Sequence, residues 1–167
     1  KIESRSGRLD ERSLAELVGQ RQILAIVDAT HPYAVAIGET ASRVAAQKGI
    51  PCLRFVRPAS VDAAAPGVEF ASNHATAAAM AFRGLRPVLL TTGTKNLAPY
   101  AAQARQTGVR LIVRTLDQPP SLEACRQAGI PPEQLIAGRG PFSVEDNRRH
   151  LRSFGIGVLV TKDSGEA

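Results

Sequence analysis

The sequence has few of the residues that hold small proteins together or stack on nucleic-acid bases. Its 167 residues include no Trp, two Tyr, five Phe, three His and two Cys. The cysteines, Cys52 and Cys125, belong to no Cys-x-x-Cys pair, so no structural zinc site is expected. One disulfide is arithmetically possible, but two reduced thiols in a cytoplasmic protein are favoured. A chain of this length can bury a core without metals or disulfides.

Long apolar runs and long basic runs are missing as well. No stretch approaches the ~18 consecutive apolar residues of a membrane span. The opening segment, residues 1–5, lacks the apolar core of a signal peptide, so we expect a cytoplasmic protein that does not contact a membrane. The net charge is +6, and 17 of the 21 basic residues are Arg. Because basic runs interleaved with aromatics are absent, an anionic small molecule is favoured over nucleic acid.

Short apolar runs alternate with helical patterns along the whole chain. The expected strands are residues 23–29, 52–56, 68–71, 87–91, 109–115, 134–137 and 157–161. The expected helices are residues 9–19, 33–48, 74–83, 97–107, 120–128 and 143–153. This alternation predicts an α/β fold of βαβ units, with a doubly wound parallel sheet flanked by helices. We expect the strand at 23–29 to be buried on both faces, and a lobe boundary that divides residues 1–84 from 85–167.

Polar residues follow nearly every expected strand, at the sheet edge where parallel α/β folds bind ligands. Thr92, Gly93 and Thr94 stand between a buried strand and a helix, an arrangement that suits phosphate oxygens. An ordinary capped turn would have the same composition. Arg114 ends the next strand, about 20 residues further on, where dinucleotide folds read the ribose 2′ substituent. A simple surface cation is the alternative.

Two further segments combine turn residues with charge. Ser143 is a candidate N-cap with Asp146 as its capping-box partner, and the preceding Arg139 and Gly140 would also allow a ligand to approach the backbone closely. The other segment, Lys162-Asp163-Ser164, is either an ionisable cluster at a strand end or a plain turn.

The first half of the chain contributes a second set of candidates. His31 is a candidate general acid, hydrogen-bond donor to substrate or structural cap. Tyr33 can stack on a planar ligand or pack at a helix start. Asp28 ends a buried strand and needs a partner there, so it is expected to hold the loop. Arg54 and Arg57 can clamp carboxylates. No nucleophile elbow, Cys–His pair or metal-ligand cluster is evident, which favours an anionic ligand and a dissociable cofactor.

Several of these segments together resemble the precorrin-6A reductase family of cobalamin biosynthesis. The resemblance rests on Val27-Asp28-Ala29-Thr30-His31-Pro32-Tyr33-Ala34, on residues 49–58, on Leu90-Thr91-Thr92-Gly93, on Gly140-Pro141-Phe142-Ser143 and on Leu159-Val160-Thr161-Lys162-Asp163-Ser164-Gly165. Residues 7–10 also fit. These motifs occur in the family's order and cover nearly the whole chain. Family members usually begin with a strand and a Gly-Gly-Thr turn, and they continue past the last motif, so the chain looks trimmed at both ends.

The resemblance implies an NAD(P)H-dependent reductase that transfers hydride to precorrin-6A, or to its cobalt form, giving precorrin-6B. It also implies two Rossmann-like lobes with the ligands in the cleft between them. On this basis the expected cofactor-binding residues, for NADPH, are Thr92, Gly93, Thr94, Arg114, Arg139, Gly140 and Ser143. The expected substrate-binding residues are Thr30, His31, Tyr33, Arg54, Arg57, Lys162, Asp163 and Ser164. His31 and Lys162 are the candidate catalytic acids, and no metal site in the protein is expected. A non-catalytic nucleotide- or anion-binding module is the alternative.

Overall fold

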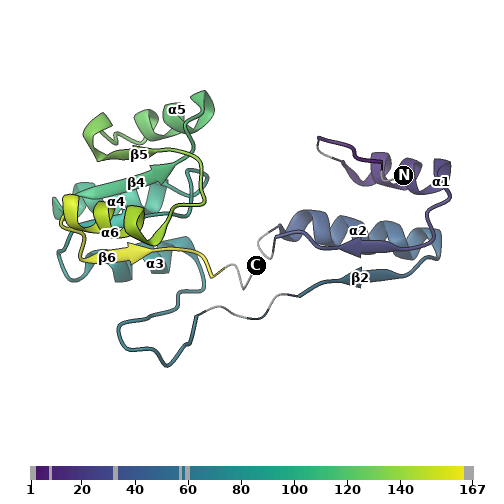
Figure 1. Cartoon of the computed structure of the whole chain (residues 1–167), viewed down its shortest axis with the longest axis horizontal. Helices are drawn as coiled ribbons and strands as arrows, with labels where there is room; N and C mark the ends of the chain where they lie inside the picture. Colours follow the sequence, from purple (N-terminus) through teal and green to yellow (C-terminus); the bar gives the residue numbers. More distant parts are fainter. Residues whose placement is uncertain (1–2, 8, 32–33, 57, 59–60, 164–167) are drawn as a thin grey trace. The chain divides into compact units, whose positions relative to one another are not determined.

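The structure, a computed structural model, describes residues 3–7, 9–31, 34–56, 58 and 61–163. The chain forms two compact units (Figure 1). Unit 1 comprises residues 1–62 together with 163–167, and unit 2 comprises residues 63–162. The expected α/β class with parallel sheets and flanking helices is confirmed.

Unit 1 combines two helices with a two-stranded parallel sheet. Its elements are α1 (Glu11–Gln20), β1 (Ile26–Asp28), α2 (Val35–Lys48) and β2 (Cys52–Arg54). Helix α1 begins at Asp10, whose carboxylate accepts the backbone N–H of Ser13. Helix α2 ends at Gly49, which has φ of 65° and adopts the left-handed conformation that favours glycine at a helix end. Helix α2 packs against both strands and against α1.

Burial on both faces was the wrong expectation for the first strand. Only residues 26–28 form β1, and the side chain of Val27 is 67% exposed. Leu53 and Phe55, in and after β2, are similarly exposed. Apolar side chains of residues 23–29 point to both faces of the sheet. Within the described part of unit 1, however, the helices cover only one of these faces.

Unit 2 is a four-stranded parallel sheet with helices packed against it (Figure 1). The strands are β3 (Val88–Leu90), β4 (Leu111–Thr115), β5 (Leu135–Ala137) and β6 (Val158–Val160). The helices are α3 (His74–Phe82), α4 (Ala98–Thr107), α5 (Pro119–Gln127), the 3-10 turn η1 (Pro132–Gln134) and α6 (Val144–Ser153). The strand order is β5-β4-β3-β6. Register pairs Leu90 with Val113 on one side and with Val160 on the other.

The core of unit 2 lies between the central strands and helices α3 and α4. All three residues of β3 are buried, as the apolar run at 87–91 predicts. Phe82 of α3 and Tyr100 of α4 are the largest fully buried side chains. They belong to one apolar cluster with β3 and β4, which holds both helices against the sheet.

Two expectations about the middle of the chain differ from the structure. Residues 68–71 form no strand, and Phe70 is 52% exposed. The segment has a strand-like composition but pairs with no neighbouring strand. The units also divide near residue 62 instead of residue 84. The reason is that α3, which we assigned to the first lobe, buries Ala78, Ala81 and Phe82 in the core of unit 2.

Two smaller observations complete the description. Both cysteines are free thiols: Cys125 is buried and Cys52 is half-buried. None of the helices in the described ranges is long and apolar enough to cross a membrane.

Candidate functional site

The strand order of unit 2 marks one place where ligands are expected. From β3 the chain passes through β4 to β5 on one side of the sheet, and it then returns as β6 on the other side of β3. Open parallel sheets bind ligands at such a reversal, beyond the carboxyl ends of the two strands. We call this end of the unit 2 sheet the carboxyl edge. Thr91 and Thr92 follow β3 there, and Thr161 and Lys162 follow β6.

The turn after β3 is anchored to β6 and leaves one hydroxyl without a partner. The backbone N–H and the hydroxyl of Thr91 both donate to the carbonyl of Val160, at 2.9 and 3.1 Å. The hydroxyl of Thr92 is buried and has no hydrogen-bond partner in the part of the chain that the structure describes. A buried hydroxyl without a partner is costly, so it commonly marks a place where a ligand or water completes the bonding.

The residues after Thr92 leave room at Gly93, and the start of α4 has no side-chain cap. Gly93 has φ of 81°, which favours glycine, and nothing lies within 4 Å of the place where a Cβ would stand. The N-cap residue of α4, Leu97, offers no side-chain acceptor to the first turn. Backbone N–H groups at such a helix start are suited to an anion. A phosphate cradle made by Thr92, Gly93 and Thr94 stays a prediction.

Arg114 lies at the end of β4 and contacts the first turn of α6. Its guanidinium donates to the side-chain carbonyl of Asn147 and stacks on the ring of Phe142, 4.4 Å from the ring centre. Burial lowers its pKa from the usual value. Arg114 is thus a half-buried, oriented cation with its position fixed by two partners, and a role in reading a 2′-phosphate remains a prediction.

The segment before α6 forms the expected cap. Ser143 accepts the N–H of Asp146, and the carboxylate of Asp146 accepts the N–H of Ser143, which confirms the predicted capping box. The hydrogen bonds from Ser143 lower the pKa of Asp146. The bond between Gly140 and Pro141 is cis, and Arg139 is exposed. The ring of His150 packs edge-on against Phe142.

In unit 1, Asp28 holds the loop that follows β1. Its side chain is 6% exposed, and one carboxylate oxygen accepts both the N–H and the hydroxyl of Thr30, at 3.1 and 2.6 Å. Arg54 lies 3.8 Å from the other oxygen. The Thr30 hydrogen bonds, and after them the charge of Arg54, lower the pKa of Asp28. The loop-holding role predicted for Asp28 agrees with these contacts.

The remaining expected site residues differ in how far they are exposed to solvent. His31 is exposed, and Lys162 and Asp163 are half-buried. Tyr33, Arg57 and Ser164 lie outside the described residues. Because the two units are described separately, the structure brings together only the candidates within each unit: Thr30 with Arg54 through Asp28 in unit 1, and Arg114 with the 138–143 segment in unit 2.

Sequence reasoning missed three residues. Gly38 of α2 allows the Asp28–Arg54 contact, because an added Cβ would stand 2.9 Å from Asp28 Oδ2 and 3.2 Å from Arg54 Nη1. His74 of α3 and Tyr100 of α4 are joined by a hydrogen bond of 2.9 Å. None of these contacts is local in sequence, so no motif or spacing could have indicated them.

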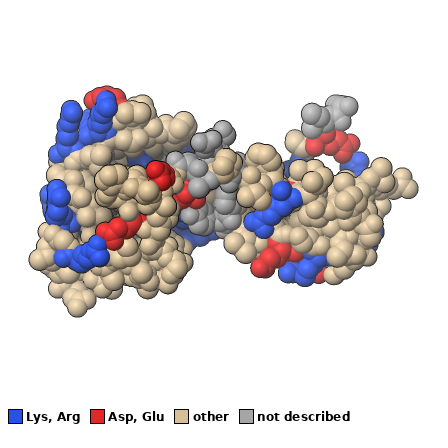
Figure 2. Space-filling view, turned by 90° about the horizontal axis from the view of Figure 1, so that it is seen from below, with Lys and Arg blue, Asp and Glu red and all other residues tan. Residues whose placement is uncertain are grey.

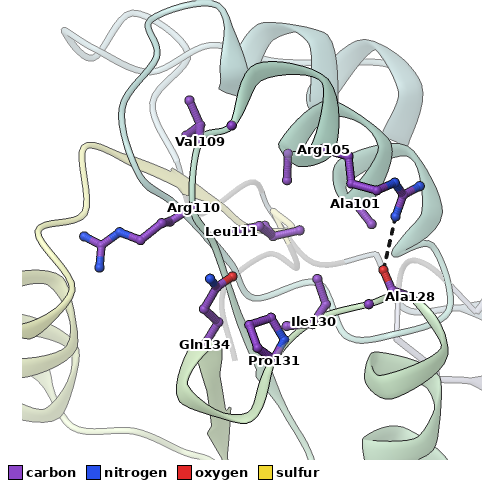
Figure 3. A pocket seen from close by; sticks show the side chains of 12 residues that line it. Ala101, Arg105, Val109, Arg110, Leu111, Ala128, Ile130, Pro131 and Gln134 are labelled. Atoms are coloured by element: carbon purple, nitrogen blue, oxygen red, sulfur yellow. Dashed lines mark hydrogen bonds between the residues drawn. The ribbon is translucent and has the colours of Figure 1, made fainter.

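A cavity of about 270 Å³ lies elsewhere in unit 2, and Figure 3 shows its lining. Gly108, Val109 and Leu111 at the start of β4 line it together with Ile130, so it is at the sheet edge opposite the carboxyl edge. The guanidinium of Arg105 is turned to the carbonyl of Ala128, at 3.2 Å. None of the expected site residues lines this cavity.

Basic residues form no continuous patch on the face seen in Figure 2. Lys and Arg are interspersed there with acidic and neutral residues. Within the described ranges, no group of three or more His, Cys, Asp and Glu side chains could hold a metal ion.

Comparison with known proteins assigns the family. Residues 1–167 match the family described as Precorrin-6x reductase CbiJ/CobK. The chain belongs to this family. A cobalt-precorrin-6A reductase of Priestia megaterium is 32% identical over 166 residues, which are 99% of this chain and 65% of that protein. A cobalt-precorrin-6A reductase of Methanothermobacter thermautotrophicus is 32% identical over 161 residues, or 96% of this chain and 53% of that protein.

A solved structure of the family confirms the fold. A "CobK precorrin-6A reductase" superimposes with a TM-score of 0.74 at 24% identity, over 95% of this chain and 62% of that chain. The chain therefore spans between about half and two thirds of the length of these relatives. The relatives from Priestia megaterium and Methanothermobacter thermautotrophicus are both described as cobalt-precorrin-6A reductase.

Proposed function

We propose that this chain is the greater part of a cytoplasmic reductase of cobalamin biosynthesis that reduces precorrin-6A, or its cobalt form, to precorrin-6B with NADPH. Membership of the Precorrin-6x reductase CbiJ/CobK family supports the substrate class. The observation that carries the cofactor assignment is the buried, unpartnered hydroxyl of Thr92 at the strand-order reversal of unit 2. When bound, NADPH supplies the hydride.

The cofactor's phosphates fit the residues at the carboxyl edge. Thr92 offers a hydroxyl donor, Gly93 offers open space, and the uncapped start of α4 offers backbone N–H groups. The hydroxyl and the N–H groups are donors, as phosphate oxygens require. Thr94 would complete the cradle.

The adenosine end would lie along the next strand. Arg114 would contact the 2′-phosphate. Dinucleotide-binding folds recognise the ribose at the end of the strand next to the phosphate-binding turn, and β4 is that strand here. Its contacts with Phe142 and Asn147 would hold the guanidinium in one orientation. Arg139, Gly140 and Ser143, which belong to the same segment as Phe142, would line this part of the site.

The tetrapyrrole would be bound through its carboxylates. Arg54 is half-exposed, and its Nε lies 3.8 Å from Asp28 Oδ2, so this long ion pair leaves guanidinium donors for a ligand carboxylate. Thr30, His31, Tyr33 and Arg57 lie near it in sequence and would share this role. Lys162, Asp163 and Ser164 would contact the same substrate.

Reduction of a double bond needs a proton as well as a hydride. We assign the transfer of this proton to His31 or Lys162, because both are side-chain types that act as general acids. The main contribution of the protein is then to hold the reacting atoms in one orientation, which is worth several kcal/mol in well-aligned reactions, on the order of 7–11.

The decisive experiment mixes the whole protein with precorrin-6A and NADPH and follows the absorbance of both. Oxidation of NADPH that depends on the tetrapyrrole supports the proposal. A folded protein that binds NADPH but never oxidises it would instead be the non-catalytic nucleotide-binding module. Steep salt-dependent binding of DNA or RNA, which depends on phosphate contacts, would point to the nucleic-acid alternative.

A further inference from the structure

His74 and Tyr100 lie at the carboxyl edge of unit 2, although neither is among the expected site residues. His74 is the first residue of α3, which runs back toward the start of β3. Tyr100 is in the first turn of α4, which leaves the end of β3. Both first turns are therefore at the same sheet edge as Thr92 and Lys162. The charge of Lys162 is close enough to lower the pKa of His74.

The contact between the two side chains is a single well-formed hydrogen bond. His74 Nδ1 lies 2.9 Å from the hydroxyl oxygen of Tyr100, and the rings meet edge-to-face with centres 5.8 Å apart. Tyr100 is completely buried, and burial raises its pKa, so its hydroxyl keeps its proton. A buried phenol needs an acceptor for that proton.

This requirement fixes the tautomer of His74. Within the described residues, His74 Nδ1 is the hydrogen-bond partner of the Tyr100 hydroxyl. If Nδ1 carried the proton, two donors would face each other or the phenolic proton would be buried without an acceptor, at a cost of about 1–3 kcal/mol. The phenol therefore donates to Nδ1, and the neutral imidazole carries its proton on Nε2.

The other ring nitrogen of His74 is free for a ligand. Nε2 has no partner in the described part of the chain, and it is not among the buried polar atoms that lack one, so it reaches the surface. A donor of fixed direction at the surface, beside a lysine and close to an uncapped helix start, has the chemistry that receives a negatively charged oxygen.

We propose that His74 is a ligand-binding residue whose Nε2–H, oriented by Tyr100, donates a hydrogen bond to an anionic oxygen of the bound reactants at the carboxyl edge. This proposal rests on the reductase function only for the identity of those reactants. Two sources of the oxygen fit the same chemistry: a phosphate of the dinucleotide or a carboxylate of the tetrapyrrole.

The electrostatics of the pair agree with a neutral donor. Burial first, and the charge of Lys162 second, lower the pKa of His74, so the ring is uncharged at neutral pH. Among the described residues, Tyr100 on α4 and Lys162 after β6 are the titratable groups that interact with this ring. A bound anion would offset both effects, so binding should raise the pKa of His74.

Nitrogen-detected NMR of the whole protein with 15N-labelled histidine tests the tautomer and the contact. The sequence has three histidines, so single replacements of His31 and His150 assign the signals. We expect His74 to show a protonated Nε2 and an unprotonated Nδ1. Inorganic pyrophosphate and an octacarboxylate porphyrin are then added separately. A shift of the Nε2 signal with pyrophosphate alone identifies a phosphate, and a shift with the porphyrin alone identifies a carboxylate.

Two variants complete the test. His74→Ala should weaken the ligand that shifts Nε2 by roughly tenfold or more, the usual value for a hydrogen bond to a charged group. Tyr100→Phe keeps the ring and should give a mixture of His74 tautomers with a smaller loss. Arg105→Ala, at the opposite sheet edge, is the control and should bind normally. A protonated Nδ1 in the native protein, or no shift of Nε2 with either probe, overturns the proposal.

The outcome is separable from that of the reductase assignment. If NADPH is oxidised with precorrin-6A but Nε2 responds to neither probe, the function stands and the role of His74 is wrong. If Nε2 responds but no NADPH is oxidised, the anion site stands and the proposed reaction fails.

Discussion

Replacement of Thr92 by Val should have opposite effects on stability and on cofactor binding. The Thr92 hydroxyl is buried without a partner, and leaving such a group unsatisfied costs about 1–3 kcal/mol. Valine has nearly the same shape and removes the polar atom. We therefore expect Thr92→Val to raise the free energy of unfolding by about 1 kcal/mol, which for a domain of about 100 residues corresponds to roughly 4–8 °C in Tm.

The same change should weaken NADPH binding. If the hydroxyl donates to a phosphate oxygen, its loss removes a hydrogen bond to a charged group, worth about 1.5–3 kcal/mol, or roughly 10- to 100-fold in Kd. Thermal unfolding without ligand and a fluorescence titration with NADPH measure the two effects. Thr94→Val is the matched control for stability, because the Thr94 hydroxyl is not buried without a partner. A less stable Thr92→Val protein, or one with unchanged NADPH affinity, would refute the reasoning.

Four further changes have expected outcomes. Arg114→Ala should weaken NADPH by roughly tenfold or more, from a lost charge-assisted contact, and should weaken NADH much less; equal losses in the two titrations would remove the 2′-phosphate assignment. His31→Ala should lower kcat with precorrin-6A and leave the Kd of NADPH unchanged; an unaltered kcat would leave His31 a structural role. Gly38→Ala should lower the free energy of unfolding in urea by about 1–2 kcal/mol, because overpacking costs more than the helix gains from Ala; Gly19→Ala, whose nearest neighbour is 4.0 Å away, should not be destabilising. Asp28 has a folded pKa below the unfolded value of about 3.9, so it stabilises the fold above that pH and this stability is lost as pH falls through the folded pKa. Asp28→Asn should therefore reduce the dependence of the free energy of unfolding on pH at acid pH. The same acid dependence in both proteins, measured by circular dichroism, would contradict this.

Elements with a strong local signal could be predicted from the sequence. The apolar run at 87–91 predicts β3, whose residues are all buried. Ser143 and Asp146 predict the capping box, because capping depends on residues three positions apart. The expected strand at 68–71 was wrong because strand formation needs a neighbouring strand, which no local pattern reports.

Contacts between distant segments could not be predicted from the sequence, for the same reason. His74 and Tyr100 are 26 positions apart, and their bond depends on how α3 and α4 pack. Gly38 lies within a helix and not in a turn, so the sequence does not indicate why glycine is needed there. The reason is the close approach of Asp28 and Arg54 to the helix. The sequence placed Arg114 at a strand end correctly but could not show that Phe142 and Asn147 fix its orientation.

The two bonds from Thr91 to the carbonyl of Val160 have a consequence for insertions and deletions. They hold the end of β3 and the end of β6 together, although Thr91 and Val160 are 69 positions apart in the sequence. Removing one residue from β6 would move Lys162 by about 3.3 Å and turn its side chain to the opposite face of the sheet. Relatives with a working site should therefore tolerate length changes in the helices and loops far better than in these three-residue strands.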